Sequence, residues 1–121
     1  YKGDGRIEFM RVSSYSGDKS TGDVILKLPV DGKYIKNHHI VIVEDIVDTG
    51  YTLDYLRKYI SSMEPASIVE CTLLNKKSRR VIDITPTYVG FEIDDLFVIG
   101  YGLDYDEKYR NLPYVGVVVN E

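Results

Sequence analysis

The sequence predicts an α/β fold with a mainly parallel sheet and flanking helices, and one strand-helix-strand unit is its clearest sign. Residues 39–43 form a short apolar run that is typical of a fully buried strand. Apolar residues then recur at helical spacing until Glu64-Pro65 ends the pattern, namely Leu53, Leu56, Tyr59 and Ile60. The run 66–74 resumes as a strand. Because such crossovers join parallel strands and are right-handed, we expect the ligand site beyond the strand ends, at residues 44–52.

Further strands are predicted around this unit. They lie at 7–12, 24–28, 87–91, 96–99 and 114–119, separated by Gly, Pro or Asp. Residues 13–23 are rich in Ser, Gly, Asp, Lys and Thr, so we expect a mobile surface loop there, and Asp31-Gly32 predicts a turn at 29–33. With 121 residues and 44% hydrophobic content, the chain can bury one core, which predicts a single domain over residues 1–121.

The composition argues against several classes of protein. The formal net charge of -4 gives no attraction to nucleic acid, and no apolar stretch reaches the roughly 18 residues of a membrane span. Cys71 is the single cysteine and is expected to be a small buried thiol. These features predict a soluble, cytoplasmic protein. The chain begins without methionine, and a Gly/Asp-rich turn leads straight into the first strand, so we expect a chain entered partway through.

The end of the buried strand is unusually acidic. It runs directly into Glu44-Asp45, and Asp48 follows after two apolar residues. Carboxylates so close together repel one another and lose hydration unless cations or hydroxyl groups meet them. This pattern predicts a ligand rich in hydroxyl groups, a Mg²⁺ ion, or both.

The turn after this strand has the opposite character. Residues 48–52 lie at a strand-to-helix junction, where free backbone N–H groups and the helix dipole favour a phosphate, and two threonine hydroxyls add donors. A simpler explanation remains open, because Asp48 or Thr49 would also serve as an ordinary helix cap. Gly50 would let the backbone approach an anion, or would simply belong to a tight turn.

Taken as a unit, an apolar strand ending in Glu-Asp-x-x-Asp-Thr-Gly-x-Thr resembles the phosphoribosyl-diphosphate motif of type I phosphoribosyltransferases. The similarity extends to the hypoxanthine-guanine branch of that family and covers about Ile7 to Val119. Further matches follow in order, at Ser14-Tyr15 with the loop after it, Leu73 to Lys76, Val89 to Glu92, Leu96 to Asp104, and Tyr109 to Pro113.

The resemblance implies the type I phosphoribosyltransferase fold and a glycosyltransferase reaction of purine salvage. Phosphoribosyl would pass from 5-phosphoribosyl-1-diphosphate to hypoxanthine or guanine, with xanthine as a further candidate base, giving IMP or GMP and pyrophosphate. Mg²⁺ is the implied cofactor, and a homo-oligomer, dimer or tetramer, is the implied assembly. The residues leave the preference among the bases open.

The resemblance also implies a role for each matching residue of the donor site. Glu44 and Asp45 would bind the ribose hydroxyls, directly or through Mg²⁺. The 5-phosphate would be held by Asp48, Thr49, Gly50, Tyr51 and Thr52. Asp48 would also act as the general base at N7 of the purine. Ser14 and Tyr15, in the mobile loop, would close over the donor.

The remaining implied roles lie on the base and the pyrophosphate sides. Lys76 would donate to O6 of the purine, Phe97 would stack on the ring, and the backbone of Val98 would meet its Watson-Crick edge. Asp104 would coordinate a metal ion bound to pyrophosphate, and Arg110 would neutralise the leaving group.

Each of these roles has an ordinary structural alternative. Phe97 lies in an apolar strand and would then pack in the core. Lys76 would belong to a solvated basic turn together with Lys77, Arg79 and Arg80. Asp104 and Arg110 would form only a surface ion pair. His38-His39 is read as a strand edge rather than a metal site, because vicinal histidines on an extended chain point apart.

The match departs from the family in one respect that bears on activity. Relatives carry an earlier strand that ends in a Leu-Lys-Gly-like turn, which binds pyrophosphate, and Lys2-Gly3 is not its equivalent. Tyr51 also stands where relatives often have lysine. We therefore expect an N-terminally shortened domain with one sheet face uncovered. The alternative functions are a catalytically silent nucleotide-binding or phosphoribosyl-diphosphate-binding regulator, and a generic flavodoxin-like or Rossmann-type domain.

Overall fold

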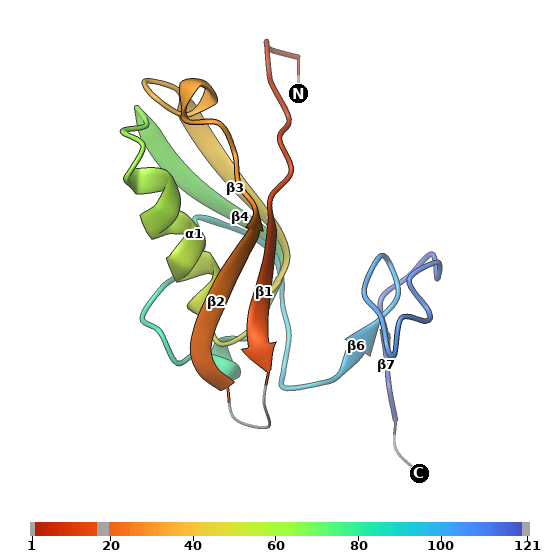
Figure 1. Cartoon of the computed structure of the whole chain (residues 1–121). Coiled ribbons are helices and arrows are strands. Elements are labelled where there is room, and N and C mark those ends of the chain that lie inside the picture. The colour runs from red at the N-terminus through yellow and green to blue at the C-terminus, as the bar shows by residue number, and fades with distance from the viewer. Residues whose placement is uncertain (1, 17–19, 120–121) are drawn as a thin grey trace.

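The computed structural model describes residues 2–16 and 20–119. At its centre is a parallel sheet in the order β3-β4-β5, formed by β3 (His39–Val47), β4 (Ser67–Asn75) and β5 (Tyr88–Glu92). Helix α1 (Tyr51–Ser61) joins β3 to β4 and lies along one side of the sheet (Figure 1). The predicted strand-helix-strand unit is therefore confirmed, and α1 is the only α-helix in the part of the chain that the structure describes.

The side chains of α1 explain where the core sits. Leu53, Leu56 and Ile60 recur at helical spacing and are buried. Leu53 forms a cluster with Val47 at the end of β3 and with Ile84, and Ile42 and Ile82 pack against this cluster. The core therefore connects the helix, the end of β3 and the segment that leads to β5.

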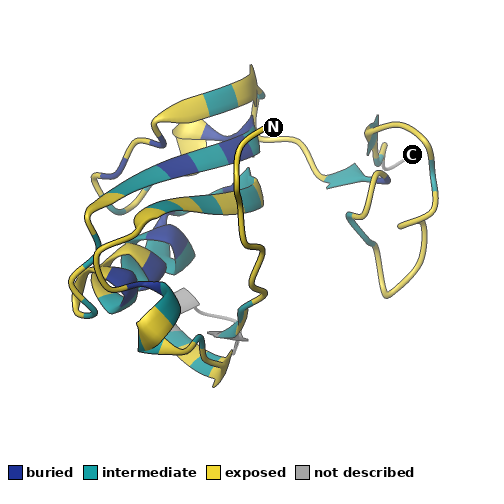
Figure 2. Ribbon diagram, turned by 90° about the horizontal axis from the view of Figure 1, so that it is seen from above, coloured by how far each residue is buried: buried dark blue, intermediate teal, exposed yellow. Residues whose placement is uncertain are grey.

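The opposite face of the sheet is exposed. Figure 2 shows many exposed residues along the strands of the sheet. Residues of β3 alternate between exposed and partly buried, and Val43 is 74% exposed. The prediction of a fully buried strand at 39–43 is therefore wrong. The strand is apolar on both faces, but α1 covers only one of them. Cys71 on β4 is only partly buried, contrary to the expected buried thiol.

An antiparallel hairpin replaces the loop predicted at 13–23. It consists of β1 (Arg11–Ser16) and β2 (Ser20–Leu28). Polar composition misled the prediction, because ladder hydrogen bonds are made by the backbone whatever the side chains. Residues 17–19 at the tip lie outside the described residues, and the predicted mobility stays a prediction.

Strand pairing also begins later than the sequence suggested. Residues 7–10 lie outside β1, and Ile7 is 81% exposed. A strand needs a neighbour to satisfy its backbone groups, and alternation of side chains alone does not supply one. The predicted turn at 29–33 corresponds to the short 3-10 helix η1 (Gly32–Tyr34), whose N-cap is Asp31.

The C-terminal part forms a second antiparallel pair set apart from the sheet (Figure 1). Its strands are β6 (Val98–Ile99) and β7 (Gly116–Val117), shorter than the predicted runs. Gly100 ends β6 with a φ of 88°, and a Cβ there would lie 2.1 Å from the carbonyl oxygen of Tyr114. Within the described ranges no helix has the length and apolarity to cross a membrane.

Candidate functional site

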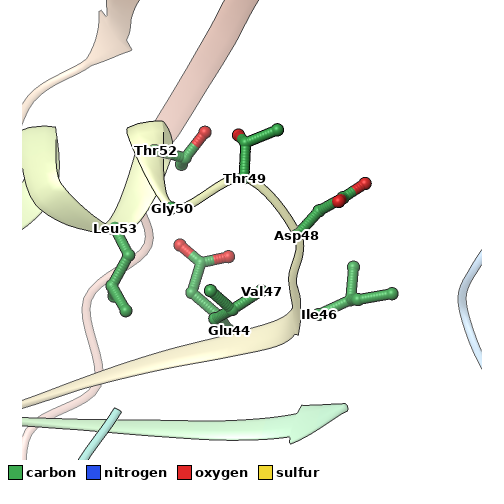
Figure 3. A pocket seen from close by; sticks show the side chains of 8 residues that line it. All are labelled: Glu44, Ile46, Val47, Asp48, Thr49, Gly50, Thr52 and Leu53. Atoms are coloured by element: carbon green, nitrogen blue, oxygen red, sulfur yellow. The ribbon is translucent and has the colours of Figure 1, made fainter. Parts of the chain in front are cut away.

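A small pocket lies where β3 passes into α1, beyond the C-terminal end of the strand. Figure 3 shows the side chains that line it, which belong to Glu44, Ile46, Val47, Asp48, Thr49, Gly50, Thr52 and Leu53. The expected ligand site at 44–52 thus coincides with a cavity. Three parallel strands end beside it in register, because Val47 pairs with Asn75 and Asn75 pairs with Glu92.

Glu44 and Asp45 lie on opposite faces of β3. The Glu44 carboxylate points from the strand toward the loop above it (Figure 3), whereas Asp45 is exposed and does not line the pocket. Adjacent residues of a strand point to opposite faces, so the prediction of three carboxylates packed together is wrong for Asp45. Nowhere in the described ranges do three His, Cys, Asp or Glu side chains gather as a metal-binding group.

Burial changes the acidity of Glu44. Loss of hydration raises the pKa of its carboxyl group to about 7, and repulsion from Asp45 acts in the same direction. A cation or a pair of hydroxyl groups in the pocket would favour the ionised form.

Gly50 is the N-cap of α1, and no side chain caps the helix. The alternative that Asp48 or Thr49 merely caps α1 is therefore wrong. Gly50 has a φ of 95°, and a Cβ there would lie 2.9 Å from Cγ2 of Ile84 and 3.0 Å from Cδ of Arg80. The glycine is required by its left-handed conformation and by packing against residues 80–84.

Residues 79–82 donate hydrogen bonds to the loop that joins β3 to α1. The carboxylate of Asp48 accepts a hydrogen bond from Nε of Arg79 at 3.2 Å, and the carbonyl of Asp48 accepts one from Nε of Arg80 at 3.1 Å. The carbonyl of Thr49 accepts from the backbone N–H groups of Val81 at 2.9 Å and Ile82 at 3.1 Å.

Sequence reasoning missed the contribution of these arginines. Arg79 and Arg80 were grouped with a solvated basic turn, and only their position after β4, the strand next to β3, hinted at a contact. The structure has a short 3-10 helix there, η2 (Lys77–Arg79). Lys77 and Arg79 are exposed, as the basic-turn alternative expects, whereas Arg80 is partly buried.

Lys76 lies at the end of β4, close to the end of β3. Its backbone N–H donates to the carbonyl of Val47 at 2.9 Å, and the residue is only 7% exposed. The solvated-turn alternative is therefore wrong for Lys76. Its neighbour Asn75 is fully buried and donates to both carboxylate oxygens of Glu92, at 3.2 and 3.0 Å.

The C-terminal hairpin carries the other predicted residues. Phe97 is 53% exposed and meets Tyr105 edge-on, with ring centroids 5.6 Å apart, so the core-packing alternative is wrong. Its carbonyl accepts from the N–H of Val118 at 2.9 Å, and Val98 is partly buried. None of these residues lines the pocket.

Asp104 and Arg110 form an ion pair with an N–O distance of 3.3 Å, as the surface-pair alternative expects. Arg110 also contacts Glu107 at 3.1 Å and donates to the carbonyl of Gly102 at 2.8 Å. The hydrogen bond to Glu107, followed by the charges of Asp104, Glu107 and Asp45, raises the pKa of Arg110.

The other predicted residues lie at the edges of the site. Tyr51 and Thr52 are the first residues of α1, and Thr52 lines the pocket. Ser14 and Tyr15 lie on β1, with Ser14 opposite Val24 of β2. His39 is the first residue of β3, the outer strand of the sheet, and its Nδ1 lies 2.7 Å from Oγ of Ser67, whereas His38 precedes the strand.

Comparison with family models places the phosphoribosyl transferase domain over residues 4–106. The chain belongs to the phosphoribosyltransferase family. It is 52% identical over 116 residues to the hypoxanthine phosphoribosyltransferase of Haemophilus influenzae, a match that covers 95% of this chain and 64% of that protein. It is 51% identical over 115 residues to the hypoxanthine-guanine phosphoribosyltransferase of Lactococcus lactis, with 94% and 62% covered. The chain thus spans less than two thirds of the length of these curated relatives.

Solved structures of phosphoribosyltransferases have the same fold. A hypoxanthine-guanine phosphoribosyltransferase of Bacillus anthracis matches with a TM-score of 0.87 at 43% identity, over 98% of this chain and 69% of that one. The hypoxanthine phosphoribosyltransferase of Trypanosoma cruzi, as a lysine-to-arginine mutant complexed with the product IMP, matches with a TM-score of 0.85 at 43% identity, over 94% and 57%. These similarities confirm the predicted type I phosphoribosyltransferase fold.

Proposed function

We propose that this chain carries the donor site and most of the base site of a hypoxanthine-guanine phosphoribosyltransferase. The enzyme would transfer phosphoribosyl from phosphoribosyl diphosphate to hypoxanthine or guanine and release pyrophosphate, giving IMP or GMP in purine salvage. One observation carries the proposal. A cavity beyond the end of β3 places the carboxylate of Glu44 beneath a loop whose side chains are not used to cap α1.

This arrangement suits a sugar phosphate because it offers two kinds of group side by side. The first N–H groups of α1 have no partner within the helix and favour a phosphate, with Thr49 and Thr52 as additional donors. The Glu44 carboxylate, on the strand side, would accept hydrogen bonds from ribose hydroxyls. Asp45 would reach the ligand only from the exposed face of β3.

The carboxylates near the pocket also fit Mg²⁺. Mg²⁺ is often held by one or two carboxylates together with substrate phosphates and water, and needs no cage of protein ligands. Glu44 or Asp45 would supply the carboxylate near the ribose, and Asp104 would supply one near pyrophosphate. When bound, the ion would neutralise charge on the diphosphate.

Asp48 is the proposed general base. Its side chain is partly exposed and would accept or share the proton at N7 while N9 forms the bond to the anomeric carbon. Arg79 holds this carboxylate in the structure, and the purine N–H would compete for the same oxygen atoms. Lys76, Phe97 and Val98 would then contact the base, Arg110 would meet the leaving group, and Ser14 and Tyr15 would cover the donor.

The names of the relatives support an enzyme rather than a regulator, because those reported above are named as phosphoribosyltransferases. The T. cruzi relative was solved in complex with IMP, which agrees with the proposed product. We further propose that the protein acts in the cytoplasm and as a homo-oligomer. The homo-oligomer is supported by the resemblance to the family. The cytoplasmic location is supported by the single cysteine, which fits a reducing compartment.

The test is pyrophosphate release from phosphoribosyl diphosphate and Mg²⁺, with hypoxanthine, guanine and xanthine assayed separately. This chain and a version extended at its N-terminus to the length of the relatives should be compared. We expect turnover with hypoxanthine or guanine in at least the extended version. Intact ribose 5-phosphate binding without turnover in either version would contradict the enzyme and favour the regulator.

A further inference from the structure

Arg80 contacts the loop of residues 48–50, which is proposed to hold the 5-phosphate and is called the phosphate loop below. Its guanidinium donates to the carbonyl of Asp48 at 3.1 Å, to the carbonyl of Ile84 and to the side-chain oxygen of Asn75. These acceptors belong to three separate parts of the chain, namely the loop after β3, the segment before β5 and the end of β4. All three are uncharged oxygens, so the positive charge of Arg80 is not neutralised by the groups it contacts.

The contact with Asn75 anchors Arg80 in the sheet. Asn75 is fully buried, pairs with Val47 of β3 in the parallel register, and donates to Glu92 of β5. A row of polar contacts therefore runs along the ends of three strands and finishes at the loop. Only a planar group with several N–H donors in fixed directions can serve such separate acceptors at once.

The contact with Asp48 has a geometric consequence for the loop. In a trans peptide the C=O and the following N–H point in opposite directions. Arg80 binds the carbonyl of Asp48, and Val81 and Ile82 bind the carbonyl of Thr49. The N–H groups of Thr49 and Gly50 must therefore point away from residues 80–82. Successive N–H groups turned to one side form a concave site for anions.

We propose that Arg80 is a positioning residue, which fixes the backbone of residues 48–50 so that their N–H groups are aligned for the 5-phosphate. This inference rests on the proposed function and adds to it a residue that does not line the pocket. Gly50 belongs to the same device, because the absence of its Cβ leaves room for Cδ of Arg80.

The experiment measures ribose 5-phosphate binding by calorimetry in the unchanged chain, Arg80→Gln and Arg80→Lys. Inosine, which lacks the phosphate, serves as the second ligand. Both variants should bind ribose 5-phosphate about tenfold more weakly, since they lose the oriented donors. Inosine binding should be unchanged. Full affinity in Arg80→Lys would show that charge alone suffices and would overturn the positioning role.

Arg57→Gln is the matched control for general destabilisation. Arg57 lies 3.0 Å from the carboxylate of Glu70, which is 2% exposed, and one oxygen of Glu70 has only this ion pair and no hydrogen bond of normal geometry. The control should lower the melting temperature without changing ribose 5-phosphate affinity, because Glu70 precedes the site end of β4. An equal loss of affinity in Arg57→Gln would overturn the inference.

Two further outcomes distinguish a failure of the proposed function from a failure of the proposed role of Arg80. If the unchanged chain binds no ribose 5-phosphate, the proposed function fails, and the role of Arg80 fails with it. If Arg80→Gln does not fold, the test is carried by Arg80→Lys and by amide exchange. The N–H groups of Val81 and Ile82, which donate to the carbonyl of Thr49, should exchange faster in Arg80→Lys than in the unchanged chain, because the loop that accepts from them loses its anchor. Unchanged exchange would contradict the positioning role.

Discussion

The loop after β3 and the hairpin of β6 and β7 carry residues proposed to contact the same substrates, yet they are held in different ways. The loop is fixed by backbone carbonyls that bind Arg80, Val81 and Ile82, and by packing against Ile84. The hairpin has strands of two residues each, and its charged groups Asp104, Glu107 and Arg110 meet one another at the surface.

The proposed donor side of the site is therefore fixed by hydrogen bonds and packing at the strand ends, whereas the proposed pyrophosphate side depends on exposed ion pairs. Hydrogen bonds in a partly buried setting resist screening by salt, and exposed ion pairs do not. Disturbing the loop should therefore impair both folding and binding. Substitutions in the hairpin should change the KM for the substrates and have little effect on the melting temperature.

The largest expected effect is on catalysis at the loop. Asp48→Asn keeps the shape of the side chain but removes the base, so turnover should fall by about a hundredfold or more. Binding of phosphoribosyl diphosphate should change far less, because the carbonyl of Asp48 that Arg80 holds is retained. Steady-state kinetics and calorimetry measure the two quantities, and equal losses in both would argue against the base role.

Two glycines compare the stability of the two regions directly. Gly50 and Gly102 have similar positive φ values of 95° and 98°, but a Cβ at Gly50 would meet Ile84 and Arg80, whereas at Gly102 nothing lies within 4 Å. Gly102→Ala should cost about 1 kcal/mol for the left-handed conformation alone. Gly50→Ala should cost about 2 to 3 kcal/mol, since crowding adds to it. Denaturant unfolding measures both, and similar values would remove the claimed difference.

The stability of the ligand-free chain should fall as pH rises from about 4.5 to about 7. Glu44 has a folded pKa of about 7 against an ordinary value of 4.5, so the folded chain binds the extra proton in this interval. Its ionisation in the pocket should cost about 2 kcal/mol, less than the full shift because the side chain is not fully buried.

Glu44→Gln provides the control for this pH dependence. Urea unfolding at several pH values should show a shallower slope in the variant than in the unchanged chain. The same substitution should remove the part of ribose 5-phosphate affinity that increases with pH through the neutral range. A slope that survives in Glu44→Gln would assign the titration to another group.

The smallest expected effect on folding is at the hairpin. Arg110→Gln removes an exposed ion pair and should leave the melting temperature unchanged within error. Its effect should appear instead in the assay, as a higher KM for phosphoribosyl diphosphate that depends on salt. A marked loss of stability would mean that the hairpin is held more firmly than its surface contacts indicate.

The elements that sequence analysis predicted well are those with local signals. The helical spacing of Leu53, Leu56 and Ile60 reflects the burial of α1, and the apolar runs of β3 and β4 located two strands, although the burial of β3 was predicted wrongly. The position of the pocket was predicted because a strand-to-helix junction combines acidic, hydroxyl and glycine residues within a few positions, whereas its phosphate-binding role stays a prediction.

The features that sequence analysis missed depend on contacts between distant segments. The role of Arg80 requires that the ends of β3, β4 and β5 lie in one row, which the sequence around Arg80 does not reveal. The hairpin of β1 and β2 is stabilised by backbone pairing that polar side chains concealed. The opposite orientation of Glu44 and Asp45, in contrast, could have been predicted from the sequence, because adjacent residues of a strand point to opposite faces.

The close approach of Gly50 and Arg80 has a consequence for how this family can change. A methyl group at position 50 would lie 2.9 Å from Cγ2 of Ile84 and 3.0 Å from Cδ of Arg80, so a larger residue there needs space from both side chains. Natural sequences with a residue other than glycine at position 50 should therefore have smaller side chains at both positions 80 and 84. The residue that the loop can carry at position 50 thus depends on side chains that lie 30 or more positions later in the chain.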